Sequence, residues 1–245
     1  ILNEGPANHT FNNVIIKNSF IGIQAEEFYL DGVPELASNS VKLYNTVIQN
    51  SAGLGLLVRN HNIIADNLLV VNSGNVLVAL QGAGVHQFTH STIANFWRFG
   101  SRSDESLVLT NYFNLPQSDG SQLQVAGDLQ ANFDNCIIYG TNSEELATDS
   151  IDGVQFNYLF NHCVLRTEKD TLDPGLVGKF STIVLNPTTP IGSAYNNPLF
   201  VDPYEDDFLL SDSSRAIDQG SLVLTDTLLL DLKGDMRDNL PDLGS

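Results

Sequence analysis

The sequence is poor in cysteine, in long apolar runs and in targeting signals. Its two cysteines, Cys136 and Cys163, are too few for a disulfide-stapled domain or for a four-ligand structural zinc site. No apolar stretch approaches the roughly 20 residues that a transmembrane helix needs, so we expect no direct membrane insertion. The chain opens at Ile1 without a signal peptide, and we interpret it as a fragment of a longer polypeptide.

Basic residues are also scarce. Lysine and arginine together number 11 against 29 aspartates and glutamates, which gives a formal net charge of −18. Such a charge repels phosphate backbones and polyanionic sugars, so it excludes nucleic acid as a partner and favours neutral glycans, cations or basic proteins. With 245 residues, the chain is long enough to bury the core of one large domain without disulfides.

One short phrase recurs along the chain. It reads "FDNCIIYG" at Phe133 and "FNHCVLRT" at Phe160, and versions of it begin at positions 11, 43, 65, 88 and 109. The successive steps are 32, 22, 23, 21, 24 and 27 residues. The third residue of the phrase is asparagine or histidine throughout: Asn13, Asn45, Asn67, His90, Asn111, Asn135 and His162.

A repeat near 22 residues, rich in β-branched side chains and without a 3.6-residue pattern, predicts an all-β fold, a parallel β-solenoid of about seven or more coils. Asparagine tolerates a left-handed backbone and can bond to the amide one coil away, and imidazole can take its place. We therefore expect the seven residues to form a ladder along one corner. Cys136 and Cys163 would then stack, either as packed thiols, which we favour because stacked side chains point the same way, or as a disulfide.

The composition changes after about residue 180. The segment 181–245 is rich in aspartate, proline and glycine, with apolar islands at Leu199–Val201 and Phe208–Leu210. These islands predict short strands between tight turns. We expect coils over residues 1–180 and, in the same domain, a last coil and strand-and-turn cap over 181–245 that covers the open edge of the final coil.

The coil phrase, with "GIQ" and "GLLV" after the first two coils, resembles the right-handed, single-stranded parallel β-helix repeats of secreted bacterial proteins. The tail "NPLFVDPYEDDFLLSDSSRAIDQGS", followed by "DLKGDMR" and "PDLGS", resembles the C-terminal element of the choice-of-anchor Q domain, and "FTHSTIANFW" is similar to stretches in such proteins from Bacteroidetes. The resemblance implies an extracellular or outer-surface protein and carries no catalytic residues that could be transferred.

The segment "NFWRFGSRSDES", with a histidine nearby in sequence, is the richest neighbourhood for binding a sugar. Aromatic rings can stack on sugar faces, and arginines can orient hydroxyl or acid groups. The alternative, which we favour, is that the aromatic residues cover a coil and the charges solvate a loop. The candidate ligand-binding residues are His86, Trp97, Arg98, Arg102, Asp104 and Glu105.

Other candidate chemistry is weaker. The acidic run "VDPYEDDF" could hold calcium, but it lacks the EF-hand spacing, so we favour an acidic turn and expect no obligatory cofactor. The repeat alignment places Asp66 and Asp134 three coils apart, roughly 14 Å, which is too far for the paired carboxylates of an inverting glycosidase. We therefore expect a non-catalytic, glycan-binding or adhesive surface module. The alternatives are a polysaccharide lyase or glycoside hydrolase with a lateral groove, and a purely structural stalk.

Overall fold

The computed structural model describes residues 8–26, 36–168, 176–185, 200–221, 230–238 and 240–244. The described residues form an all-β structure dominated by long parallel sheets, and no α-helix occurs among them. Consequently, nothing in these ranges forms a helix of the length and apolarity that a membrane span requires. The parallel sheets are compatible with the predicted solenoid.

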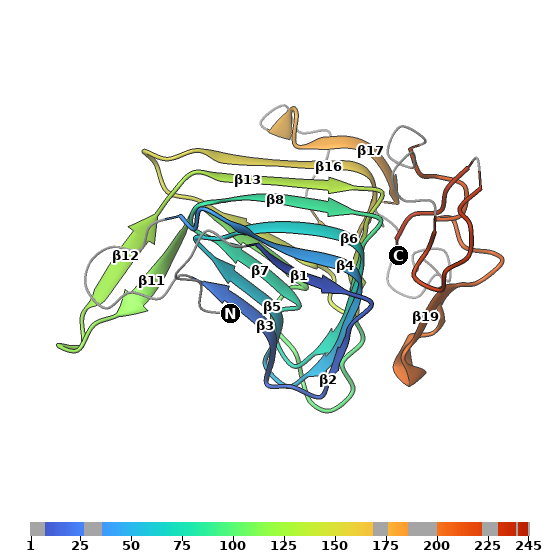
Figure 1. Ribbon diagram of the computed structural model, residues 1–245, viewed down its shortest axis with the longest axis horizontal. Coiled ribbons are helices and arrows are strands. Elements are labelled where there is room, and N and C mark those ends of the chain that lie inside the picture. The colour runs from blue at the N-terminus through green and yellow to red at the C-terminus, as the bar shows by residue number, and fades with distance from the viewer. Residues whose placement is uncertain are drawn as a thin grey trace.

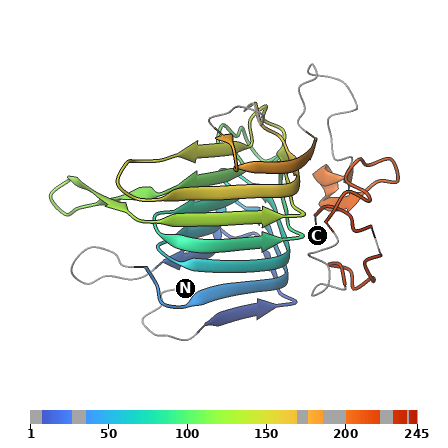
Figure 2. The ribbon, with the colours of Figure 1, turned by 90° about the horizontal axis from the view of Figure 1, so that it is seen from above.

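The chain passes through three strand positions in the same order several times (Figures 1 and 2). Strands at the first position pair in parallel from one repeat to the next. They are β1 (His9–Asn12), β4 (Ser40–Ser51), β6 (Asn62–Ser73), β8 (Gly84–Thr89), β13 (Leu129–Asp134), β16 (Phe156–Leu165) and β17 (Phe180–Leu185).

The second position is formed by β2 (Ile15–Lys17), β9 (Thr92–Asn95), β14 (Ile137–Gly140) and the later parts of the long strands β4, β6 and β16. A separate five-stranded sheet forms the third position. Its strands, in chain order, are β3 (Ile21–Glu26), β5 (Leu54–Arg59), β7 (Val78–Gln81), β10 (Leu107–Thr110) and β15 (Leu146–Asp149). The alternating burial of these strands points every second side chain into a shared core.

Equivalent core side chains stack directly on one another. Phe88, Phe133, Phe160 and Phe180 occupy one column, with ring centroids 4.9, 4.7 and 5.7 Å apart and nearly parallel planes. Leu43 and Ala65 continue this column on β4 and β6. A parallel pairing without slippage brings identical residue types together, and this explains why the repeated phrase keeps an aromatic or aliphatic residue at its first position.

The predicted corner is present, but one of its seven predicted residues is replaced by another. Six of the seven predicted ladder residues have φ between +44° and +56°, and they end the first strand position in register. Asn67 donates to Oδ1 of Asn45 at 3.0 Å, and Asn135 lies 3.0 Å from Nε2 of His90. The six are Asn13, Asn45, Asn67, His90, Asn135 and His162.

Asn111 does not belong to this corner, so that part of the prediction is wrong. It follows β10 at the third strand position, and its side chain bonds to the backbone N–H and C=O of Ile151 at 2.9 and 3.0 Å. The seventh corner residue is Thr182, with φ +53°, because Asn161 pairs with Ser181 and Cys163 with Ile183. The phrase at Leu109 resembles the repeat by composition but lies on another face.

An antiparallel hairpin explains the misassignment. Strands β11 (Tyr112–Pro116) and β12 (Gln122–Ala126) follow β10 directly and project from the sheets (Figures 1 and 2). Their turn contains Asp119 and Gly120, with φ +83° at the glycine. The sequence "SDG" between alternating apolar residues is a hairpin signal, and it marks an insertion rather than a coil.

Cys136 and Cys163 are free, buried and at equivalent positions on adjacent strands, which confirms the prediction of packed thiols. Each Sγ lies 3.3 Å from a main-chain carbonyl oxygen, that of Asp134 for Cys136 and that of Phe133 for Cys163. Burial and the neighbouring Cys163 raise the pKa of Cys136, which makes it an inert core residue rather than a reactive thiol.

The described part of the tail begins with β18 (Phe200–Asp202), the 3₁₀ helix η2 (Pro203–Glu205) and β19 (Asp207–Leu210), so strands form at both predicted apolar islands. Among the described residues, its contacts run along the flank of the sheets, from Asn50 to Asn135 (Figure 2). The expected cap over the final coil stays a prediction. A second apolar cluster joins the tail to the outer side of β6, β9, β14 and β16; it contains Val71, Ala94, Phe96, Ile137, Tyr139, Val164, Phe200, Phe208, Ala216 and Leu243.

Because the corner residues have positive φ, we expect an unusual order of stability for substitutions at Asn135. Glycine at this position keeps the left-handed backbone but loses the bonds to His90 and Ser221, and we expect a loss of about 1–3 kcal/mol. Alanine should cost about 1 kcal/mol more than glycine, because its Cβ opposes a φ of +54°. Urea denaturation of both variants measures the difference.

Asn111 provides the matched control for this order. It is not among the residues with positive φ, so Asn111→Ala should be at least as stable as Asn111→Gly. If Asn135→Ala is as stable as Asn135→Gly, the positive φ at this corner does not restrict which residues position 135 can hold.

Candidate functional site

The segment between β9 and β10 contains five of the six predicted binding residues, and burial divides them. Arg102 is buried and forms a bidentate ion pair with Glu145, at 2.8 and 2.6 Å, with only 3% and 0% of the two side chains exposed. Glu145 also accepts from the N–H and hydroxyl of Ser106 and from the N–H of Asn142. Arg102 therefore ties two loops together and is not available to a ligand.

The remaining residues of this segment do not converge on one site. Asp104 contributes its carbonyl oxygen to Arg102 and to Asn142, at 2.6 and 3.0 Å, and Glu105 is half-buried next to Ser106. Trp97 packs edge-on against Phe99, whose ring is 66% exposed. These contacts match the favoured interpretation of a packed and solvated loop.

Arg98 connects this segment to the tail. Its guanidinium lies 2.6 Å from Glu205, and the two side chains are 44% and 70% exposed. The same group lies 5.3 Å from the centroid of the Phe99 ring. An ion pair this exposed contributes little to stability, although its distance equals that of the buried pair.

Comparing the two ion pairs tests how strongly burial changes the effect of losing the arginine on stability. Arg102→Ala should destabilise the protein by about 3–5 kcal/mol, because it leaves Glu145 charged and buried without its partner. Arg98→Ala should change the free energy of unfolding by less than about 1 kcal/mol. Chemical denaturation of both variants decides the point, and equal losses would contradict the assignment of Arg102 as a buried clamp.

His86 lies in the core, where it is not exposed to a ligand. On β8 it pairs with Ile63 on one side and Ala131 on the other, and it is 1% exposed. Neither of its ring nitrogens has a hydrogen-bond partner among the described residues. Burial, and then the nearby His61, lower the pKa of His86 to about 3. The prediction of His86 as a ligand-binding residue is therefore not supported by its position.

The depressed pKa of His86 predicts acid sensitivity. The folded state holds the imidazole neutral, whereas the unfolded chain binds a proton below about pH 6.5, so stability is retained above that pH and lost as the pH falls toward 3. From His86 alone we expect the free energy of unfolding to fall by about 2 kcal/mol between pH 7 and pH 5. His86→Leu should flatten this slope in urea titrations, and an unchanged slope would refute the explanation.

The acidic run of the tail acts in docking. The carboxylate of Asp206, a residue with φ +64°, accepts from the amides of Gln49, Asn50 and Asn72 at 2.8, 3.0 and 2.7 Å. Two of these amides belong to a second column of positive-φ asparagines, Asn18, Asn50 and Asn72. No group of three or more histidine, cysteine, aspartate or glutamate residues within the described ranges is arranged to hold a metal ion. Calcium binding stays a prediction.

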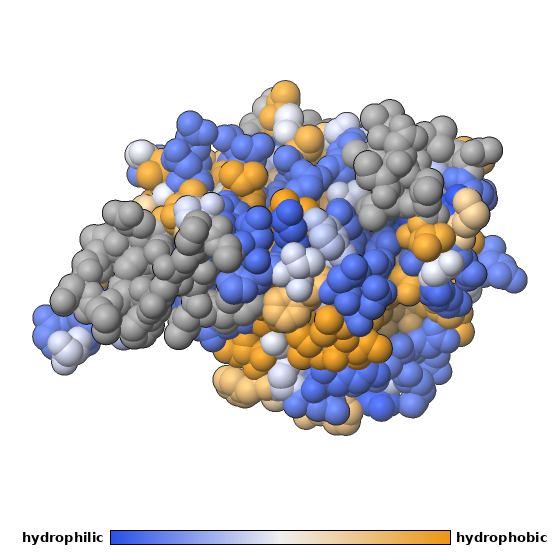
Figure 3. All heavy atoms as spheres, viewed as in Figure 1, coloured by the Kyte–Doolittle hydropathy of each residue, from blue (hydrophilic) through white to orange (hydrophobic). Residues whose placement is uncertain are grey.

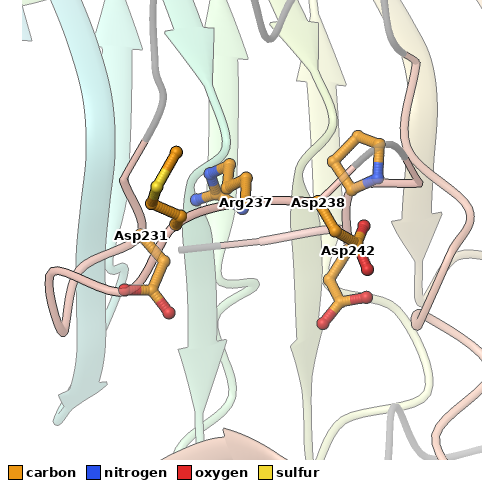
Figure 4. Close-up of a pocket in the computed structure, with 6 residues that line it drawn as sticks. Asp231, Arg237, Asp238 and Asp242 are labelled. Carbon is orange, nitrogen blue, oxygen red and sulfur yellow. The ribbon is translucent and has the colours of Figure 1, made fainter.

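A pocket of about 150 Å³ lies in the tail, lined by Asp231, Met236, Arg237, Asp238, Pro241 and Asp242 (Figure 4). Arg237 lies between Asp231 on one side and Asp238 and Asp242 on the other. Burial lowers the pKa of Arg237, and its Nη2 donates to Asn67 of the corner at 2.8 Å.

The aspartates around this pocket cap turns. Asp231 accepts from the backbone N–H of Lys233 and Asp235, and Asp242 accepts from that of Asp218. The pocket is smaller than the roughly 300 Å³ of ordinary ligand sites. We therefore assign this region to docking of the tail rather than to a ligand.

The outer face of the first strand position carries a row of polar side chains that the predicted site left out. These residues directly precede the corner and alternate with the buried core column. In order across the strands, the row is Asn12, Tyr44, Asp66, Thr89, Asp134 and Asn161. The second residue of each repeated phrase contributes to this row, except that the phrase at Leu109 supplies Thr110, which lies on β10 at the third position.

No protein-family model, curated protein or solved structure matches the chain. The candidate site therefore follows from the geometry alone. The regular row of polar side chains from Asn12 to Asn161 is the candidate site, and we call it the outer row.

Proposed function

We propose that the chain is a right-handed, single-stranded parallel β-helix of about seven or more coils, from an exported, surface-attached protein, and that it binds neutral glycans along the outer row. The observation that carries this proposal is the outer row itself. Strands about 4.8 Å apart present amide, hydroxyl, carboxylate and phenol groups in a straight line. A linear polymer can lie across such strands and meet a polar group at each one.

The chemistry of the row suits uncharged sugars. Tyr44 offers an aromatic ring for stacking, and Asn161 offers a donor and an acceptor for hydroxyl groups. The net charge of −18 opposes anionic polymers, and Asp66 and Asp134 add to that field within the row. The proposed site therefore moves from the Trp97–Glu105 segment to the outer row.

Attachment to a longer polypeptide is part of the same proposal. Apolar side chains gather over β2 and β3 at the lower centre of Figure 3. On the first repeat, Ile15 and Phe20 are 64% and 73% exposed, and Phe11 and Ile16 are only partly buried. Since open strand edges with exposed apolar residues recruit further strands, this end supports additional coils of the same polypeptide.

A glycan array with matched variants tests the binding function. We expect the wild-type chain to bind neutral glycans and Tyr44→Ala to bind about tenfold more weakly, a loss of about 1.4 kcal/mol from the missing stacking surface. Trp97→Ala serves as the control and should bind like the wild type. Thermal melting of each variant separates lost binding from lost folding.

Two other results would change the conclusion. Loss of binding in Trp97→Ala with full binding in Tyr44→Ala would return the site to the segment after β9. If the folded wild-type chain binds no glycan on the array, the purely structural stalk becomes the better account.

A further inference from the structure

The register of the strands brings Asp66 and Asp134 closer than the sequence suggested. Asp66 pairs with Thr89, and Thr89 pairs with Asp134, so the two aspartates are two strands apart instead of three. Two steps of about 4.8 Å separate their Cα atoms by about 9.6 Å rather than 14 Å. This Cα separation is just above the 6.5–9.5 Å that separates the carboxyl groups of inverting glycosidases, and the side chains can lean toward each other to bring the carboxyl groups within that range.

Both aspartates point outward on the same face. Ala65 and Phe133, which precede them, are fully buried in the core column, and alternation therefore places Asp66 and Asp134 on the outer surface. Both are partly exposed. The side chain of Thr89 lies between them in the row.

The environments of the two carboxyl groups differ. Burial raises the pKa of Asp66, and a hydrogen bond from Thr89 opposes that shift only in part. Asp134 instead accepts amide hydrogen bonds from Gln87 and Asn161, at 2.7 and 2.9 Å. These two amides hold the Asp134 carboxyl in place between β8 and β16. We assign the role of acid to the more buried Asp66 and the role of base to Asp134.

We propose that Asp66 and Asp134 are the acid and the base of an inverting hydrolase that cleaves a neutral polysaccharide lying along the outer row. The Asp66 carboxyl donates its proton to the glycosidic oxygen as the bond from that oxygen to the anomeric carbon breaks. A water molecule attacks the same carbon from the opposite face and gives a proton to Asp134. One water is consumed and two hydroxyl groups form. Proton exchange with solvent then returns Asp66 to its acid form and Asp134 to its carboxylate.

The neighbours in the row set the direction of the polymer. Tyr44 lies one strand beyond Asp66, and Asn161 lies one strand beyond Asp134. The cleaved bond would therefore lie over Thr89, with one sugar stacked near Tyr44 and the next hydrogen-bonded near Asn161. This inference rests on the proposed binding function, because the same row must hold the polymer.

Release of new reducing ends tests the inference. The wild-type chain is incubated with hydroxyethyl cellulose, xylan, galactomannan and starch, beside the variants Asp66→Asn and Asp134→Asn. We expect the wild type to act on at least one polymer and each variant to be at least 100-fold slower. Asp152→Asn, in an exposed turn away from the row, is the control and should keep the wild-type rate.

The stereochemistry and the binding assay give independent readouts. Proton NMR of the first product should show an anomeric configuration opposite to that of the cleaved linkage, and retention would overturn the inference. Wild-type rates in either asparagine variant, or no new reducing ends from any polymer, would also overturn it. Glycan binding without cleavage refutes the hydrolase and leaves the proposed function standing, whereas a chain that neither binds nor cleaves refutes both.

Discussion

Parallel pairing in register is the constraint on which the remaining features depend. Each strand places its side chains directly over those of its neighbours. An unfavourable side chain therefore disturbs the packing of both adjacent strands, and a favourable residue type recurs at the same position. In the core, this pairing produces the stacked rings from Phe88 to Phe180. In the backbone, it aligns the positive-φ residues of the corner from Asn13 to Thr182. At that corner the chain must turn with positive φ, and asparagine tolerates this conformation better than most residues.

The same constraint explains how the tail is held. Two columns of asparagines have amide groups that repeat along the flank, and the tail contacts members of both. Asp206 accepts from Asn50 and Asn72, Arg237 donates to Asn67, and Ser221 bonds to both ends of the Asn135 amide. Polar corner residues therefore both turn the chain and dock a segment that is distant in sequence.

Burial, more than residue type, decides what the charged residues do. Arg98 and Arg102 are four positions apart and both lie 2.6 Å from a glutamate, yet one pair is at the surface and the other is enclosed. The aspartates of the outer row are partly exposed and face away from the core. The aspartates of the tail pocket are mostly committed to turns.

The sequence by itself determined the all-β class, the repeat, six of the seven corner residues and the stacking of Cys136 on Cys163, because these follow from local periodicity. It also predicted the two strands of the tail. The structure decided that the two thiols are not bonded to each other. Only the tertiary structure decided that Asn111 leaves the corner, that the tail follows the flank, and that His86 is in the core while Arg102 is clamped. The physical reason is that an inserted hairpin changes which strands pair without altering the local pattern. A single such change moved Asp66 and Asp134 from three strands apart to two.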